Sequence, residues 1–272
     1  MKKILFPTDL SPHAKTVFEY ALVLAKKMNA SITVFSAHGR PNIALEDIEV
    51  QEERSETVIK NLRKFVTDHL PDSYDDIEFQ YEARIAYPGE GIAKAAEELK
   101  PELIVMGMRD RTNDIGARFG SSAFDTIRDV DCPVLAIPPG TDFVPIKNLV
   151  YAVDFEFEDL PVINHLLDWS QQFQTDTHIL HVFEKNEHKT IVQDKMAVLS
   201  GVYFDNPRLS FEIRGGKFQE VIDEFLEEKD AGVLVMLSHR RRFLERVIFP
   251  SQTVKVARKL NLPLLVFKAR YN

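Results

Sequence analysis

The residues best placed to do chemistry lie in a glycine-bearing loop between two apolar runs. The run 103–106 ends at Gly107, a polar loop then reaches Gly120, Ser121 and Ser122, and a second apolar run follows at 134–137. Glycines ahead of a helix start leave backbone N–H groups and the positive end of the helix dipole open to an anion such as phosphate. The alternative is an ordinary connection that needs glycines only for its turns, since isolated glycine patterns are weak signals.

Two strands and a helix must position this loop. The apolar runs 103–106 and 134–137 have strand length and are bounded by Gly or Pro, which predicts strands buried on both faces of a parallel sheet. Between them, Ala123, Phe124 and Ile127 follow a helical pattern, with Ser121 or Ser122 as its N-cap. The loop therefore lies at the carboxyl end of a parallel strand, where open α/β sheets bind ligands.

The first half of the chain alternates strands and helices throughout. A short apolar run ends at Pro7, Thr8 and Asp9, and Ser11-Pro12 then gives an N-cap and a first helical residue. The remaining predicted elements are a helix to Met28, a strand at 32–35, a loop at 38–49, a helix to His69, a strand at 77–83 and a helix at 92–99. This order predicts a five-stranded parallel sheet with helices on both faces.

The second half repeats the first. Asp154 echoes Asp9 at an offset of 145 residues, whereas Met236 echoes Met106 at an offset of 130. The second half therefore lacks 15 residues between its second and third strands, where a short helix is expected around 191–199. We predict an α/β protein of two similar doubly wound domains, 1–140 and 141–272, joined at a stiff Pro138-Pro139-Gly140 turn and related by a pseudo-two-fold axis.

The fifth strands of the two domains, 134–137 and 264–267, are short and apolar. Each would be a bare edge if its domain stood alone, and bare apolar edges pair with other strands. We predict that the two edges pair antiparallel within one chain. A fragment cut near Gly140 should then dimerise or aggregate in light scattering; a stable, soluble monomer at high concentration would contradict the pairing.

Composition limits the classes of partner. The 272 residues carry a formal charge of −8, which opposes a broad nucleic-acid interface because such surfaces need clustered Lys and Arg. A single cysteine, Cys132, excludes an intramolecular disulfide and fits a small buried hydrophobic residue better than a nucleophile. The N-terminus has too few consecutive apolar residues for a signal peptide, and no apolar segment has the length of a membrane span. A cytoplasmic protein is therefore expected.

Taken together, these stretches resemble the universal stress protein family in its tandem two-domain form, over the whole chain. Pro7, Asp9 and Ser11 are similar to the family's P-x-D-x-S turn after the first strand. Gly107, Gly120 and Ser121 resemble the first glycine, last glycine and hydroxyl residue of its G-x2-G-x9-G-[S/T] loop. The resemblance implies a doubly wound fold, with ATP or AMP bound by some members and not by others.

Carried over, the resemblance implies an adenine-nucleotide site in the first domain. In nucleotide-binding relatives the acid that matches Asp9 lies against the adenosine moiety, and a small apolar residue at the place of Ala37 lies by the base. The full set of nucleotide-binding candidates is Pro7, Thr8, Asp9, Ala37, Met106, Gly107, Arg109, Gly120, Ser121 and Ser122.

Departures from the family pattern weaken this expectation in the first domain and remove it in the second. Asp110 stands where the middle glycine would be and places a Cβ and a negative charge beside a phosphate, an effect that Arg109, Arg111 and Arg118 could offset or that could leave these arginines as solvated loop charges. In the second domain Leu237, Arg240 and Pro250 replace the glycines, and only Ser251 survives.

Two functional hypotheses remain. The first is a stress-response protein that binds ATP or AMP in its N-terminal domain; the second is an interaction protein that acts through its tandem surface, with further self-association, and binds no nucleotide. Catalysis is expected to be absent or limited to slow ATP hydrolysis, since no nucleophile elbow or general base is evident. The eight histidines show no metal-binding spacing, and no metal is expected.

Overall fold

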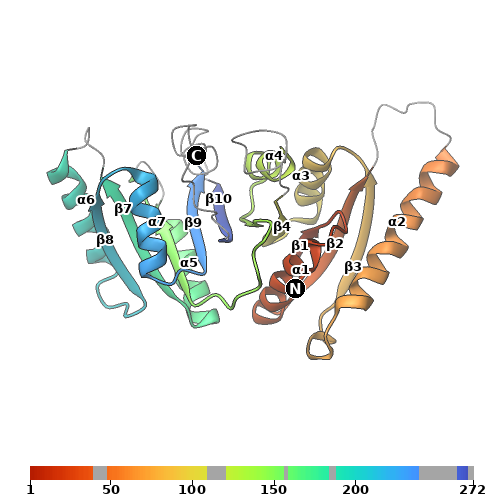
Figure 1. Cartoon of the computed structure of the whole chain (residues 1–272), viewed down its shortest axis with the longest axis horizontal. Coiled ribbons are helices and arrows are strands. Elements are labelled where there is room, and N and C mark those ends of the chain that lie inside the picture. The colour runs from red at the N-terminus through yellow and green to blue at the C-terminus, as the bar shows by residue number, and fades with distance from the viewer. Residues whose placement is uncertain (39–47, 109–120, 156–158, 184–187, 239–261, 269–272) are drawn as a thin grey trace. The chain divides into compact units, whose positions relative to one another are not determined.

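The computed structural model describes residues 1–38, 48–108, 121–155, 159–183, 188–238 and 262–268. The chain divides into two compact units; the described residues up to Phe143 belong to the first and those from Val144 to the second. Each unit is an α/β sandwich of the doubly wound kind, as the strand and helix alternation predicts (Figure 1).

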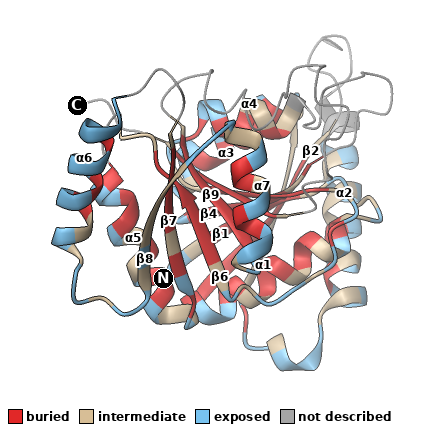
Figure 2. Cartoon of the chain, turned by 60° about the vertical axis from the view of Figure 1, so that its left-hand side comes forward, coloured by how far each residue is buried: buried red, intermediate tan, exposed pale blue. Residues whose placement is uncertain are grey.

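The first unit holds five parallel strands in the order β3-β2-β1-β4-β5. Apolar runs form its central strands, which are buried on both faces (Figure 2). The strands are β1 (Lys2–Pro7), β2 (Ala30–His38), β3 (Phe79–Ile85), β4 (Leu103–Gly107) and β5 (Val134–Ile137).

Four α-helices connect these strands: α1 (Ala14–Met28), α2 (Ile48–His69), α3 (Pro88–Leu99) and α4 (Ser121–Asp129), with a 3₁₀ turn at Asp72–Tyr74. The chain moves outward from β1 through α1 and α2, then returns past β1 to β4, so that α1 and α2 cover one face and α3 and α4 the other (Figure 1). The crossovers diverge between β1 and β4, and such a divergence opens a crevice at the carboxyl ends of the two strands.

The second unit repeats this topology, with the order β10-β9-β6-β7-β8 and all described pairs parallel. As predicted, the helix between its second and third strands is short: α6 has 14 residues where α2 has 22. The elements are β6 (Asn148–Ala152), α5 (Asp159–Phe173), β7 (Asp176–Phe183), α6 (Lys189–Val202), β8 (Leu209–Gly215), α7 (Phe218–Glu228), β9 (Val233–Ser238) and β10 (Leu264–Lys268).

The start of α1 differs from the sequence prediction. The helix begins at Ala14 and not at Pro12, and Ser11 is not its N-cap; His13 occupies the capping position and makes no side-chain cap. The reason is the turn before it, in which the Ser11 N–H donates to Asp9 Oδ1 at 3.0 Å and the Ser11 carbonyl accepts from the Ala14 N–H at 2.9 Å. Ser11 is therefore part of a turn organised by Asp9, which delays the helix.

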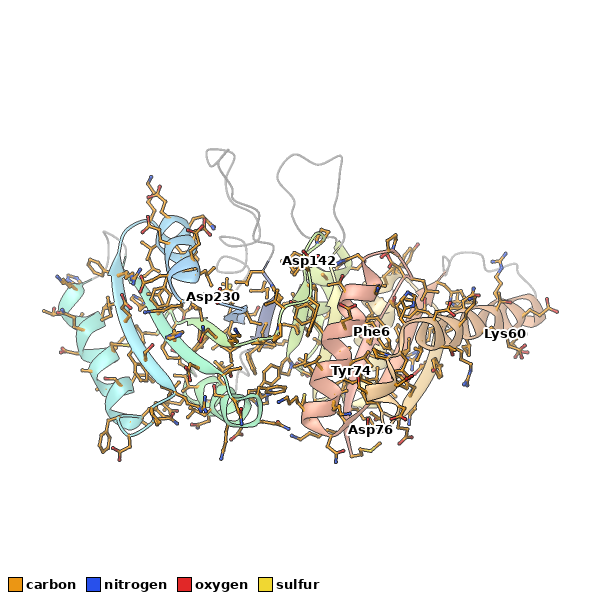
Figure 3. All side chains as sticks on the ribbon, turned by 60° about the horizontal axis from the view of Figure 1, so that its bottom comes forward. Phe6, Lys60, Tyr74, Asp76, Asp142 and Asp230 are labelled. Atoms are coloured by element: carbon orange, nitrogen blue, oxygen red, sulfur yellow. The ribbon has the colours of Figure 1, made fainter. Side chains whose placement is uncertain are left out.

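Aromatic side chains fill the space between β1, α1, α2 and β3. Phe18 is fully buried, with its ring centroid 5.4 Å from that of Phe6 and 5.5 Å from that of Phe65. Figure 3 shows Phe6 in the interior of the unit and Lys60 on the outer side of α2. Distances of this kind are typical of aromatic pairs that contribute both area and geometry to a core.

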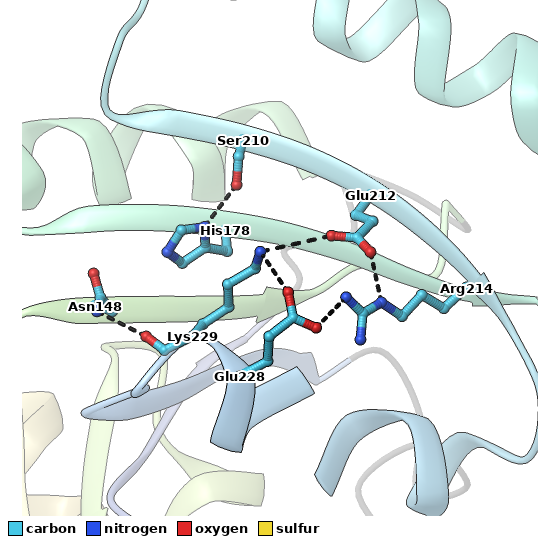
Figure 4. A network of polar contacts seen from close by, with 7 residues as sticks. All are labelled: Asn148, His178, Ser210, Glu212, Arg214, Glu228 and Lys229. Carbon is cyan, nitrogen blue, oxygen red and sulfur yellow. Dashed lines mark hydrogen bonds and ion pairs between the residues drawn. The ribbon is translucent and has the colours of Figure 1, made fainter. Parts of the chain in front are cut away.

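A pair of ion networks also follows the repeat. In the second unit, Arg214 donates to Glu212 and Glu228, and Lys229 Nζ lies 3.0 Å from Glu228 Oε1 (Figure 4). In the first unit, Arg84 binds Glu82 and Glu98 in the same way, each residue 130 positions earlier than its counterpart. Because these groups are partly solvent-accessible, each pair contributes about 1 kcal/mol, so the networks mark the repeat more than they stabilise it.

Within the described residues, no helix is long and apolar enough to cross a membrane. The predicted pairing of the two fifth strands concerns the relation between the units and stays a prediction. So does the functional division into domains 1–140 and 141–272.

Candidate functional site

A cavity of about 300 Å³ opens at the carboxyl ends of β1, β2 and β4, at the divergence of the crossovers. Its volume is at the lower end of the range of small-molecule pockets, roughly 300–1,000 Å³. Seven of the ten predicted nucleotide-binding residues line it: Pro7, Thr8, Asp9, Ala37, Met106, Gly107 and Ser122.

The other three predicted residues are placed less completely. Ser121 is the first residue of α4 and Ser122 the second, so neither precedes the helix as its predicted N-cap. Gly120 and Arg109 lie outside the described residues, as do Asp110, Arg111 and Arg118. The loop that carries the central part of the glycine motif is thus untested, and its role remains a prediction.

The turn after β1 fixes the carboxylate of Asp9. The Thr8 N–H donates to the Phe35 carbonyl at 2.8 Å, which continues the β1–β2 pairing into the turn. The Leu10 N–H then donates to Thr8 Oγ1 at 3.0 Å, and Leu10 adopts a left-handed backbone conformation with φ 56°. With the Ser11 N–H bound to its Oδ1, Asp9 is held at the mouth of the cavity as a hydrogen-bond acceptor.

Sequence reasoning missed His13, which lines the same cavity. Its Nε2 lies 3.0 Å from the carbonyl oxygen of Ile137, at the end of β5. Its ring packs against Gly107: a Cβ at that position would lie 3.2 Å from His13 Cδ2 and 3.3 Å from Val17 Cγ2. The absence of a side chain at Gly107 therefore makes room for α1 as well as for a ligand. A polar side chain one turn after Asp9, at the start of a helix, was the only available signal.

The described lining divides by element into an apolar part and a polar part. Ala37, Pro88 and Ile92 form a wall from β2 and α3, where Gly91 approaches Ala37 so closely that an added Cβ would lie 3.0 Å from the Ala37 Cβ. Thr8, Asp9, Ser11 and His13 form the opposite wall, from the β1–α1 turn. Among the described lining residues, Asp9 alone carries a full charge at neutral pH.

The corresponding positions of the second unit hold a buried polar pair. At the offset of 145, Phe6 becomes Tyr151 and Ala14, a lining residue in the first unit, becomes Asp159. The Tyr151 hydroxyl donates to Asp159 Oδ1 at 2.5 Å, and both side chains are buried. Leu237 replaces Gly107 and is also buried. At these three positions the second unit therefore carries larger or more polar buried side chains than the first.

Burial raises the pKa of the Asp159 carboxyl to about 6, an effect that the hydrogen bond from Tyr151 partly offsets and that the negative charge of Asp154 reinforces. Burial also raises the pKa of Tyr151 well above its ordinary value. Nearby, His181 Nδ1 donates to the Val153 carbonyl at 2.9 Å. Perturbed groups of this kind are common in functional sites and also in structural networks. Here the two perturbed groups, Tyr151 and Asp159, bind each other and are both buried, which favours a structural role.

The structure also bears on the state of Cys132 and on possible metal-binding clusters. Cys132 is half-buried, so the prediction that it is a buried residue was too strong. Burial raises the pKa of its thiol to about 11, and a thiol in this state is a poor nucleophile at neutral pH. In the described part of the chain, no group of three or more His, Cys, Asp or Glu side chains is arranged to hold a metal ion.

Comparison with known proteins gives a consistent result. The model of the universal stress protein family matches residues 1–138 and again 145–268. The curated relative "Universal stress protein Slr1230" from a Synechocystis strain is 22% identical over 290 residues, which cover 98% of this chain and 100% of that protein.

Solved structures share the fold. The crystal structure of a universal stress protein from Archaeoglobus fulgidus has a TM-score of 0.72 at 21% identity and covers 98% of this chain and 96% of that one. A putative universal stress protein from Pseudomonas aeruginosa has a TM-score of 0.63 at 17% identity, with 98% and 93% coverage.

Proposed function

Since this chain belongs to the universal stress protein family, with one family domain in each half, we propose that its first unit binds an adenine nucleotide, ATP or AMP, and that its second unit binds none. The observation that carries the proposal is the asymmetry of the two equivalent positions. The first unit has a cavity of about 300 Å³ lined by Asp9, Ala37 and Gly107, whereas the second unit carries the buried Tyr151–Asp159 pair at the positions of Phe6 and Ala14 and a buried Leu237 at that of Gly107.

The two walls of the cavity suit the two parts of a nucleoside. The apolar wall of Ala37, Pro88 and Ile92 offers a flat base a dry surface, and Asp9 offers an acceptor to hydroxyl or amino groups. Ser122, near the start of α4, lies where backbone N–H groups at a helix N-terminus favour phosphate. The only reaction expected on the nucleotide is slow hydrolysis. Among the described lining residues, Asp9 and His13 are the side chains that could accept a proton from the attacking water.

A matched pair of variants tests the proposal by calorimetric titration with ATP and AMP. Asp9→Ala is expected to weaken binding about tenfold or more, because the site loses its charged acceptor. Asp154→Ala, the same change at the repeated position, is the control and is expected to leave binding unchanged. A flat titration of the folded parent protein at millimolar nucleotide would refute the proposal. If Asp154→Ala alone abolished binding, the nucleotide site would lie in the second unit, contrary to the proposal.

The second hypothesis, a stress-response interaction protein without nucleotide, has one observation in its favour. The described cavity lining contains no Lys or Arg, and its one full charge is the carboxylate of Asp9, so this part of the site does not attract phosphate. Asp110 in the loop adds a further negative charge. Asp110→Gly separates the hypotheses: if it creates ATP binding that the parent lacks, the natural protein has lost the site. If the parent already binds ATP and the change has little effect, the interaction hypothesis loses its main support.

A further inference from the structure

The imidazole of His13 is held on one edge only. Its Nε2 is 3.0 Å from the Ile137 carbonyl, and its Cδ2 is the ring atom that a Cβ on Gly107 would approach most closely, at 3.2 Å. The edge formed by Cδ2 and Nε2 therefore faces the ends of β4 and β5. The edge that carries Nδ1 is turned away from these strands, on a residue that lines the cavity.

The partner of Nε2 fixes the tautomer of the neutral ring. A carbonyl oxygen can only accept, so Nε2 carries the hydrogen and Nδ1 presents a lone pair. Within the described residues Nδ1 has no hydrogen-bond partner, and this nitrogen is not fully buried. Because His13 lines the cavity, a ligand there can reach it. The Ile137 carbonyl also accepts the Met108 N–H at 2.8 Å and stays satisfied if His13 is replaced.

His13 thus adds a ring-nitrogen acceptor to the polar wall. Asp9 supplies a carboxylate, which only accepts, and Thr8 and Ser11 of the same β1–α1 turn supply hydroxyl groups. The carboxylate and the ring nitrogen recognise a ligand group that donates. The apolar wall of Ala37 and Ile92 suits the base of a nucleoside, which leaves the sugar and its hydroxyl donors for the polar wall.

We propose that His13 is a specificity-determining residue, whose Nδ1 accepts a hydrogen bond from a hydroxyl group of the ligand's ribose and so selects ribonucleotides over deoxyribonucleotides. This inference rests on the proposed nucleotide site. A site built to pair with a hydroxyl rejects the analogue that lacks it, because the bound analogue covers the acceptor and leaves it without a donor. Gly107 supports the selection by leaving room for the Cδ2–Nε2 edge of the ring against β4.

The test compares AMP with 2′-deoxy-AMP and 3′-deoxy-AMP by calorimetric titration of the full-length protein. The parent is expected to bind AMP about tenfold more tightly than at least one of the deoxy analogues. His13→Phe keeps an aromatic ring and removes both nitrogens, so it is expected to bind AMP and that analogue equally. Gly107→Ala, which must displace the ring by a few tenths of an ångström, is expected to reduce the preference without abolishing it.

The outcomes separate this inference from the proposed function. If the parent binds none of the three ligands, this inference is wrong, and the proposed function is wrong as well unless the parent binds ATP in the titration described above. If the parent binds AMP and both deoxy analogues with equal affinity, or if His13→Phe keeps the full preference, His13 does not select the sugar, whereas nucleotide binding stands. Thermal unfolding of His13→Phe close to that of the parent is the folding control, and the ratio of affinities is a quantity that a merely structural role of His13 would not change.

Discussion

Phe18→Ala is expected to destabilise the first unit by about 3–5 kcal/mol, the usual cost of removing a fully buried Phe side chain. The side chain is 0% exposed and touches the rings of Phe6 and Phe65, so its loss leaves a cavity that these rigid neighbours cannot close. Because Phe6 also lines the candidate ligand site, weaker nucleotide binding should accompany the loss of stability.

The single tryptophan makes this prediction measurable unit by unit. Trp169 lies in α5, so its fluorescence reports the second unit, whereas circular dichroism reports both. In urea, Phe18→Ala is expected to shift part of the dichroism transition to lower urea and to leave the Trp169 transition in place. Ile163→Ala, the change at the repeated position in the second unit, is the matched control and should shift the Trp169 transition. Equal shifts of both signals in Phe18→Ala would contradict independent cores.

Asp159→Asn is expected to stabilise the second unit by about 2–3 kcal/mol near pH 7.5. Burial raises the pKa of Asp159 to about 6, whereas an aspartate in the unfolded chain titrates near 4. Between these two values the folded state holds a proton that the unfolded state has released, so stability falls as the pH rises through this window. Each pH unit costs about 1.4 kcal/mol, and the loss is complete once the folded carboxyl has ionised.

The asparagine removes the charge and keeps a carbonyl oxygen that accepts a hydrogen bond from the Tyr151 hydroxyl. Residue 159 should therefore make no pH-dependent contribution to the stability of the variant's second unit from pH 4 to 7.5. Tyr151→Phe is the opposing control: it takes the donor from a buried carboxylate and is expected to destabilise the unit at neutral pH. Urea unfolding followed by Trp169 fluorescence at a series of pH values provides the measurement. The same pH dependence in Asp159→Asn and the parent would show that the buried carboxyl has no energetic role.

Local patterns of apolar residues in the sequence were sufficient to predict most of the strands and helices. Continuous apolar runs such as 103–106 predicted central strands, because they have strand length and are bounded by Gly or Pro, and apolar residues three and four apart predicted the helices. The internal repeat then located the second unit and the shorter α6. The start of α1 escaped this reasoning, because Asp9 and Ser11 form a turn whose hydrogen bonds compete with helix capping.

The candidate site shows the same division. The sequence predicted its location, because parallel strands that diverge in topology place their carboxyl-end turns around one crevice, and the family resemblance supplied the seven predicted residues that line it. Only the tertiary structure decided what fills it. His13, a lining residue, is held by a carbonyl 124 positions away, and in the second unit a buried Tyr151–Asp159 pair stands at the positions of Phe6 and Ala14. Spacing along the chain fixes which strand ends meet, whereas packing in three dimensions fixes which side chains share the space between them.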